Sequence, residues 1–165
     1  MEDFPELLDT LTQQEKELQF TVFGSDTALA LGLKVVELAK DRQKSVTVNI
    51  TINGKVLFHH AMQGASADQA DWIRRKNNVV ERFGRCSFFI GIDHKHRGVA
   101  FDEIKYLDPA DYAAHGGAFP ITIRNVGMIG TVTVSGLRQA EDHAIAVEAL
   151  RAVLARRSWY NWCDQ

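Results

Sequence analysis

The sequence has few cysteines, which argues against a disulfide-stabilised or zinc-binding domain. Cys86 and Cys163 are the two cysteines among 165 residues, and neither belongs to a C-x-x-C pair, the spacing typical of structural zinc sites. A chain of this length can bury a core without disulfides. We therefore expect reduced cysteines in a cytoplasmic protein, no metal site, and a single domain over residues 1–165.

Three further absences narrow the function. No stretch approaches the roughly 18 apolar residues that a membrane helix requires, so we expect no membrane partner. The formal net charge is −2, whereas non-specific nucleic-acid binders are usually basic, so we expect no nucleic-acid partner. The sequence also lacks the G-x-S-x-G, P-loop and H-E-x-x-H motifs. It therefore points to no particular reaction.

Two β-hairpins are the clearest local prediction. Residues 45–52 alternate in hydrophobicity and are followed by Asn53, Gly54 and a second run at 55–58. An Asn-Gly pair favours a type I′ turn because both residues tolerate a positive φ. A second hairpin is expected from the runs 119–123 and 128–134.

Helical spacing of apolar residues predicts helices from Ser25 to about Lys40, from Ser66 to Gly84 and over 138–156. Ser66 and Gln69 match a capping box at the start of the second helix. Residues 1–19 form an N-terminal polar helix or arm, 86–97 suit either a helix or a strand, and 98–118 form a loop. The aromatic tail 158–165 suits an oligomer interface. This order predicts an α+β fold, with helices packed against a mostly antiparallel sheet.

Several segments together resemble the GlcG/HbpS-like family of haem-degrading domains. They are 58–61 (FHHA), 71–76 (DWIRRK), 115–121 (HGGAFPI), 126–136 (VGMIGTVTVSG) and 141–143 (EDH). The first two resemble an uncharacterised branch that includes a small cytosolic yeast protein. The resemblance covers about residues 20–157. It implies a profilin-like fold, a homo-oligomer and, as in some members, haem as a candidate cofactor.

Three segments offer hydrogen-bond donors that could serve one ligand. A glycine pair lets backbone N–H groups approach an anion closely, and the start of a helix attracts negative charge. An arginine adds a forked cation, with an acidic and an amide side chain on the same helix face. These candidates are Gly116 and Gly117, Ser135 and Gly136, and Arg75 with Asp71 and Asn78.

We expect the Arg75 face, the loop at residues 115–117 and the turn at 135–136 to converge on one cleft. Such a cleft would suit a carboxylate or a haem propionate. The alternative is a solvated helix face, a glycine turn and an ordinary helix cap.

Two histidines complete the candidate site. His60 ends the first hairpin and His115 precedes the glycine pair, so either could act as a ligand or as an acid/base. The alternative for His60 is a partly buried, hydrogen-bonded histidine. The favoured function is binding of a small molecule, haem or another anion. The two alternatives are an enzyme with a histidine acid/base in the same pocket and an oligomeric adaptor that binds another protein.

Overall fold

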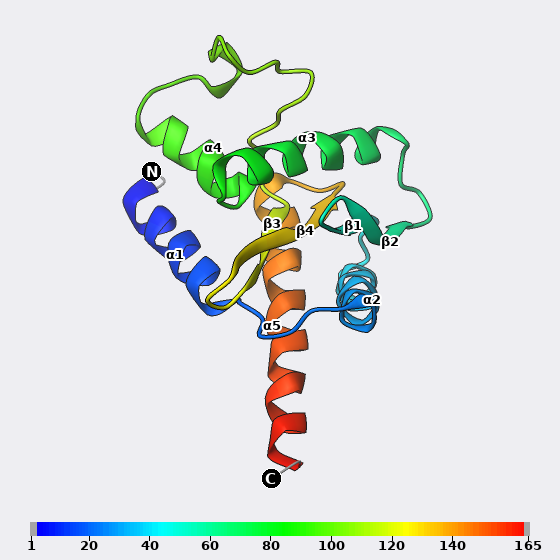
Figure 1. Cartoon of the computed structure of the whole chain (residues 1–165). Coiled ribbons are helices and arrows are strands. Elements are labelled where there is room, and N and C mark those ends of the chain that lie inside the picture. The colour runs from blue at the N-terminus through cyan, green and yellow to red at the C-terminus, as the bar shows by residue number, and fades with distance from the viewer. Residues whose placement is uncertain (1–2, 164–165) are drawn as a thin grey trace.

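Five helices surround a four-stranded sheet in the part of the chain that the structure, a computed structural model, describes (Figure 1). It describes the backbone of residues 3–163 and the side chains of residues 3–156. The elements in chain order are α1 (Phe4–Glu17), α2 (Ser25–Asp41), β1 (Thr47–Ile52), β2 (Lys55–Ala61), α3 (Asp68–Phe83), α4 (Ser87–His96), the short 3-10 helix η1 (Phe101–Glu103), β3 (Ala118–Ile123), β4 (Gly127–Ser135) and α5 (Gln139–Cys163). The side chains of the expected aromatic tail, 158–165, lie outside the described residues.

The sheet is antiparallel throughout, with the strand order β2-β1-β4-β3. Each hairpin supplies two adjacent strands, and β1 pairs with β4 to join the two hairpins. Asn53 and Gly54 have φ values of 49° and 77°, as the predicted type I′ turn requires. The predicted α+β fold is therefore confirmed.

The two faces of the sheet differ in chemistry because side chains alternate along each strand. Val48 and Ile50 of β1 and Val132 of β4 are fully buried in the main hydrophobic core, which α2 and α5 complete. Thr47 and Thr133 point the other way and hydrogen-bond to Gln69 and Asn77 of α3. Figure 1 shows α3 above the sheet and α2 and α5 below it. A polar layer therefore lies beneath α3.

Helix α3 begins two residues later than predicted. Its N-cap is Ala67, which makes no side-chain cap, and Gln69 accepts a hydrogen bond from Thr47 Oγ1 at 2.8 Å. The predicted capping box between Ser66 and Gln69 is therefore wrong, because the sheet engages Gln69 instead. The helix ends at Gly84, whose φ of 68° provides a left-handed C-cap.

Residues 86–97, which suited either a helix or a strand, form helix α4. Cys86 is its N-cap, and the Sγ atom accepts a hydrogen bond from the N–H of Phe89 at 3.4 Å. A loop with one 3-10 turn then leads to β3, as predicted. None of the helices in the described residues is long and apolar enough to cross a membrane.

Candidate functional site

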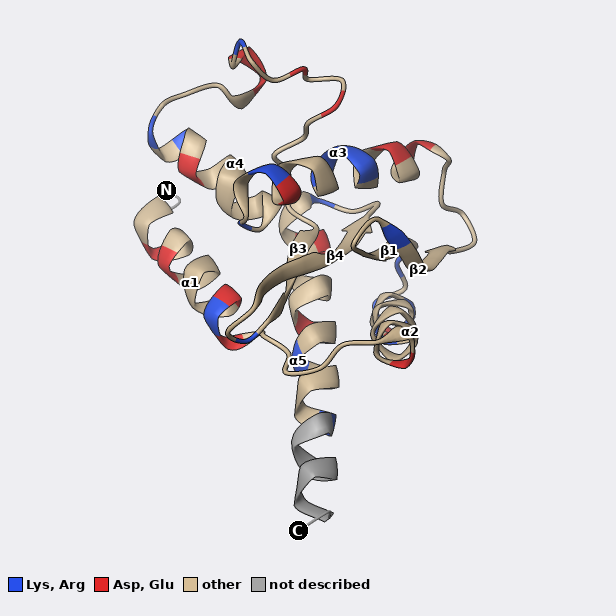
Figure 2. Ribbon diagram, in the orientation of Figure 1, with Lys and Arg blue, Asp and Glu red and all other residues tan. Residues whose placement is uncertain are grey.

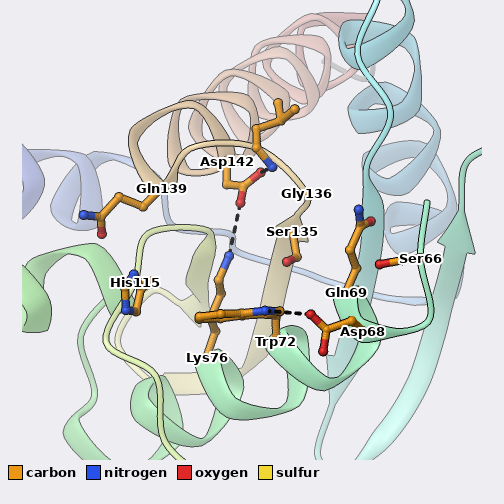
Figure 3. A pocket seen from close by; sticks show the side chains of 11 residues that line it. Ser66, Asp68, Gln69, Trp72, Lys76, His115, Ser135, Gly136, Gln139 and Asp142 are labelled. Atoms are coloured by element: carbon orange, nitrogen blue, oxygen red, sulfur yellow. Dashed lines mark hydrogen bonds and ion pairs between the residues drawn. The ribbon is translucent and has the colours of Figure 1, made fainter. Parts of the chain in front are cut away.

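A cavity of about 320 Å³ lies between the first turns of α3, the loop before β3 and the turn from β4 into α5. Its lining is predominantly polar (Figure 3). The lining residues are Ser66, Asp68, Gln69, Trp72, Lys76, His115, Ser135, Gly136, Leu137, Gln139 and Asp142. Three of the predicted site residues, His115, Ser135 and Gly136, are therefore brought together.

Two glycines let the loop before β3 approach its neighbours closely. Gly117 has a φ of 134°, and a Cβ there would collide with Val134 O and lie 2.8 Å from Lys76 Nζ. A Cβ on Gly116 would collide with the carbonyl oxygen of Gln139, whose side-chain Oε1 accepts from the Gly116 N–H at 3.1 Å. The glycine pair thus lets the loop pack closely against α3 and α5.

Lys76 and Asp142 form a buried ion pair at the wall of this cavity. Lys76 Nζ lies 3.2 Å from Asp142 Oδ2 and donates to the carbonyl oxygen of Val134 at 3.1 Å. Both side chains are at most 3% exposed. Burial lowers the pKa of Lys76, although the adjacent carboxylate opposes this shift. Burial likewise raises the pKa of Asp142 to about 6, against the opposing charge of Lys76.

The two backbone N–H groups just before α5 already have carboxylate partners from its first turn. The N–H of Leu137 donates to Asp142 Oδ1 at 3.0 Å, and the N–H of Arg138 donates to Glu141 Oε2 at 3.3 Å. These carboxylates occupy the position at which an external anion would meet the helix dipole. The Ser135–Gly136 turn therefore borders the cavity, but the helix start offers less to an anion than the sequence predicted.

Trp72 and His115 line one side of the cavity, and Figure 3 shows their rings beside Lys76. The two rings meet edge to face with centroids 5.3 Å apart, and Trp72 Nε1 donates to Asp68 Oδ2 at 3.1 Å. Partial burial, followed by the positive charge of Lys76, lowers the pKa of His115. This environment favours the neutral imidazole of His115, the form that can accept a proton from a ligand.

Arg75, Asp71 and Asn78 do not line the cavity. Arg75 Nη2 donates to Pro109 O, and Asn78 Nδ2 donates to Asp111 O, both at 2.8 Å, while Asp71 accepts from the neighbouring Arg74. This helix face holds the 98–117 loop in place. The predicted convergence of Arg75 with the glycine loop on one cleft is therefore not found. Arg75 reaches the site indirectly, since its guanidinium stacks 4.7 Å from the Trp72 ring.

His60 also lies away from the cavity. It is exposed on β2, an edge strand, where its backbone pairs with Val48. Of the two adjacent histidines, it is His59 that hydrogen-bonds a neighbouring side chain, through Nδ1 to Asn49 Nδ2 at 3.1 Å.

The sequence prediction missed Lys76 and Asp142, the two charged residues of the site. Lys76 follows Arg74 and Arg75 directly, and we assigned the ligand-binding cation to the second position of this run. The missed signal was helical spacing, because residues 73, 76 and 80 fall on one face of α3. Ile73 and Val80 are buried, and Lys76 lies between them.

A haem does not fit this cavity well. Its porphyrin ring needs broad apolar walls, and within the cavity Trp72 and Leu137 are the large apolar side chains. The volume is at the lower end of the roughly 300–1,000 Å³ of small-molecule sites. Among the described residues, no three His, Cys, Asp or Glu side chains gather as a metal-ligating group. A small polar ligand fits these walls better.

Comparison with known proteins places the chain among relatives of similar length. UPF0303 protein SCO2848 of Streptomyces coelicolor is 49% identical over 140 residues, which cover 85% of this chain and 89% of the relative. UPF0303 protein NT01EI_1570 of Edwardsiella ictaluri is 44% identical over 149 residues, covering 90% of this chain and 95% of the relative.

Solved structures share the same fold. The Ybr137w protein superposes with a TM-score of 0.82 at 33% identity, over 93% of this chain and 91% of that one, which supports the predicted yeast branch. HbpS superposes with a TM-score of 0.63 at 20% identity, over 82% of this chain and 92% of that one. A PduOC–haem complex gives 0.68 at 20% identity, over 79% and 94% respectively. The family described as haem degrading protein HbpS-like matches residues 23–151. The chain therefore belongs to the HbpS-like family.

Proposed function

We propose that this protein binds a small polar molecule in the cavity beside Lys76 and Asp142. The observation that carries this proposal is that a buried ion pair borders an open space of about 320 Å³. A purely structural ion pair gains nothing from an adjacent cavity, because water there weakens its attraction. Ser135, Gln139 and His115 add hydroxyl, amide and imidazole groups from other segments.

The charges around the cavity favour a neutral ligand over an anion. The positive charge of Lys76 is balanced by Asp142. Asp68 adds a negative charge at the start of α3, where Figure 2 shows acidic residues. A molecule with hydroxyl or carbonyl groups would hydrogen-bond to this lining without having to overcome that charge. The sequence suggested haem or another anion as the ligand. The binding screen therefore includes both, so that they can be compared with neutral molecules.

A ligand-observed NMR screen of the full chain tests the proposal. The screen contains small sugars, aldehydes, carboxylic acids and haem, and each hit is repeated with two variants at exposed positions. Ser66→Trp fills the cavity rim, whereas Thr10→Trp places the same side chain in a groove between α1 and α5. We expect neutral polar hits that are lost in S66W and kept in T10W. Hits that survive S66W, or a screen that yields no hit, would refute the proposal.

A histidine-assisted enzyme is the second candidate, and it is favoured by the place of His115 in the same cavity and by its lowered pKa. Incubation of each screened ligand with the protein, followed by mass spectrometry of the products, tests this function. Turnover that is lost in His115→Gln while binding persists would support an enzyme. Unchanged ligands after prolonged incubation would leave binding as the function.

We further propose that the protein forms a homo-oligomer in the cytoplasm. Within the described residues, the outer edge of β2 pairs with no other strand, and Leu29, Leu33 and Val56 nearby are more than half exposed. Open strand edges and exposed apolar groups favour self-association. For the compartment, the buried free thiol of Cys86 suits the reducing cytoplasm. A mass of about 18.5 kDa in light scattering at micromolar concentration would contradict the oligomer.

A further inference from the structure

Lys76 lines the cavity wall, and its amine has two acceptors there. An ammonium group has three N–H donors, and the described residues accept two of them, through Val134 O and Asp142 Oδ2. The side chain is 3% exposed and lines the cavity wall. A third position on Nζ is therefore available to a molecule inside the cavity.

The surroundings of Nζ are kept open by a glycine. A Cβ on residue 117 would lie 2.8 Å from Nζ, so any side chain at that position would crowd the amine. Gly117 adopts a φ of 134°, which side chains rarely tolerate. The same loop carries His115 to the cavity wall. Lysine, carboxylate and imidazole thus meet around one space.

Lys76 and Asp142 are poised to exchange a proton. Their atoms are 3.2 Å apart, and both groups are buried. Burial disfavours both charged forms, as the lowered pKa of Lys76 and the raised pKa of Asp142 show. A neutral amine, the nucleophilic form of lysine, therefore costs less here than at the protein surface.

We propose that Lys76 is a nucleophilic amine that binds a small aldehyde or ketone covalently as an imine. This inference rests on the proposed binding function and names the ligand class of the same cavity. Imine formation would explain why a lysine, a carboxylate and a cavity lie next to one another. An ion pair that only joined α3 to α5 would explain neither the cavity nor the third position on Nζ.

The reaction balances with the groups present. Asp142 takes one proton from the Lys76 ammonium, and the Nζ lone pair attacks the carbonyl carbon as the carbon–oxygen π bond breaks. The carbonyl oxygen takes that proton back from Asp142 to give a carbinolamine. The nitrogen then loses a second proton to the hydroxyl group through Asp142 or His115, and water leaves as the carbon–nitrogen double bond forms. The net change converts a lysine ammonium and a carbonyl into a protonated imine and water.

Reductive trapping tests the proposal on the full chain. The protein is mixed with glycolaldehyde or propanal and sodium cyanoborohydride at pH 7, and the modified lysines are mapped by peptide mass spectrometry. Exposed Lys44 and Lys55 serve as internal controls. We expect Lys76 to be modified severalfold faster than either, because its lowered pKa leaves more of the amine in the neutral, nucleophilic form at pH 7. Modification of Lys44 and Lys55 with Lys76 untouched would overturn the proposal.

Three variants separate chemistry from folding. Lys76→Arg keeps the positive charge and removes the nucleophile, so the fast adduct should vanish while the thermal transition persists. If K76R does not fold, Asp142→Asn provides a second test. This variant should slow trapping at Lys76 without changing trapping at Lys55. S66W should block trapping at Lys76 alone. If the screen finds ligands that S66W excludes but no aldehyde traps Lys76, the imine is refuted and the binding function stands.

Discussion

The Nζ atom of Lys76 lies 3.2 Å from Oδ2 of Asp142, and the two side chains are 3% and 2% exposed. This contact joins α3 to the first turn of α5 across the polar edge of the sheet. Asp142 also accepts the N–H of Leu137, so one carboxylate neutralises the lysine and caps the helix. The pair is consequently coupled both to the stability of the fold and to the proposed site.

Lys76→Met should destabilise the protein in a pH-dependent manner. The variant leaves Asp142 buried without its partner, which typically costs about 3–5 kcal/mol. The pKa of Asp142 is already raised to about 6 in the native protein and rises further without Lys76, so its ionisation opposes folding as the pH increases through that range. Urea unfolding should therefore show a larger deficit at pH 8 than at pH 5.

The double variant K76M/D142N serves as the control. It removes both charges and keeps a side-chain oxygen for the Leu137 N–H, so most of the lost stability should return at pH 8. A deficit in K76M that is equal at both pH values would show that Asp142 does not carry a buried charge.

His143 should make the protein acid-sensitive. Burial lowers its pKa to about 4. Nε2 contacts Gln14 Oε1 at 2.7 Å, and the buried Nδ1 has no hydrogen-bond partner among the residues that the structure describes. The native pKa lies below the unfolded value of about 6.5. The neutral ring therefore contributes stability that is complete above pH 6.5 and is lost as the pH falls through 4.

Comparison with His143→Gln isolates this contribution from other acid-sensitive groups. Between pH 7.5 and pH 4, the free energy of unfolding should fall by about 3 kcal/mol more in the wild type than in H143Q. Parallel pH profiles for the two proteins would instead mean that His143 is protonated at no cost in the folded state.

Gly117→Ala should be more damaging than Gly127→Ala. Both residues have a positive φ, 134° and 124°, so both variants incur the backbone strain of about 1–3 kcal/mol. A Cβ at Gly127 meets nothing within 4 Å, whereas one at Gly117 meets Val134 O and Lys76 Nζ. We expect G117A to lose stability and ligand binding together, and G127A to keep binding. Equal unfolding midpoints would refute the close contact around Lys76.

Gly54→Val should destabilise the first hairpin by about 1–3 kcal/mol, because a β-branched residue fits its φ of 77° poorly. No atom lies within 4 Å of a Cβ at this position, so the effect is conformational rather than steric. Asn53→Gly keeps a residue that tolerates positive φ and should change stability little. An unchanged denaturant midpoint for G54V would show that the turn is not type I′ in solution.

The fold was largely predictable because its determinants are local. The Asn53–Gly54 turn, the alternating strands and the helix end at Gly84 each depend on a few neighbouring residues. Residues 86–97 were ambiguous because several of their apolar residues are β-prone while the segment packs as a helix. The family was predicted because the segments 115–121 and 126–136 resemble those of HbpS-like domains.

The site was predictable only in part, because it depends on which side of α3 faces the sheet. In the run of Arg74, Arg75 and Lys76, local chemistry does not distinguish the three cations. Ile73 and Val80 are buried, so the face of α3 that carries Lys76 is the one that packs against the sheet. Similarly, Arg75 is held away from the site by a hydrogen bond to the backbone carbonyl of Pro109, and a backbone contact of this kind leaves no pattern in the sequence.

Ligand binding is proposed to take place beside Lys76 and not on the Arg75 face of α3. The most direct measurement is the dissociation constant of one screened ligand for the wild type, for S66W and for Arg75→Ala. We predict that S66W weakens binding by at least about tenfold, roughly 1.4 kcal/mol. R75A should change it less, because Arg75 contacts the cavity only through Trp72. Normal binding to S66W together with lost binding to R75A would contradict a ligand site beside Lys76.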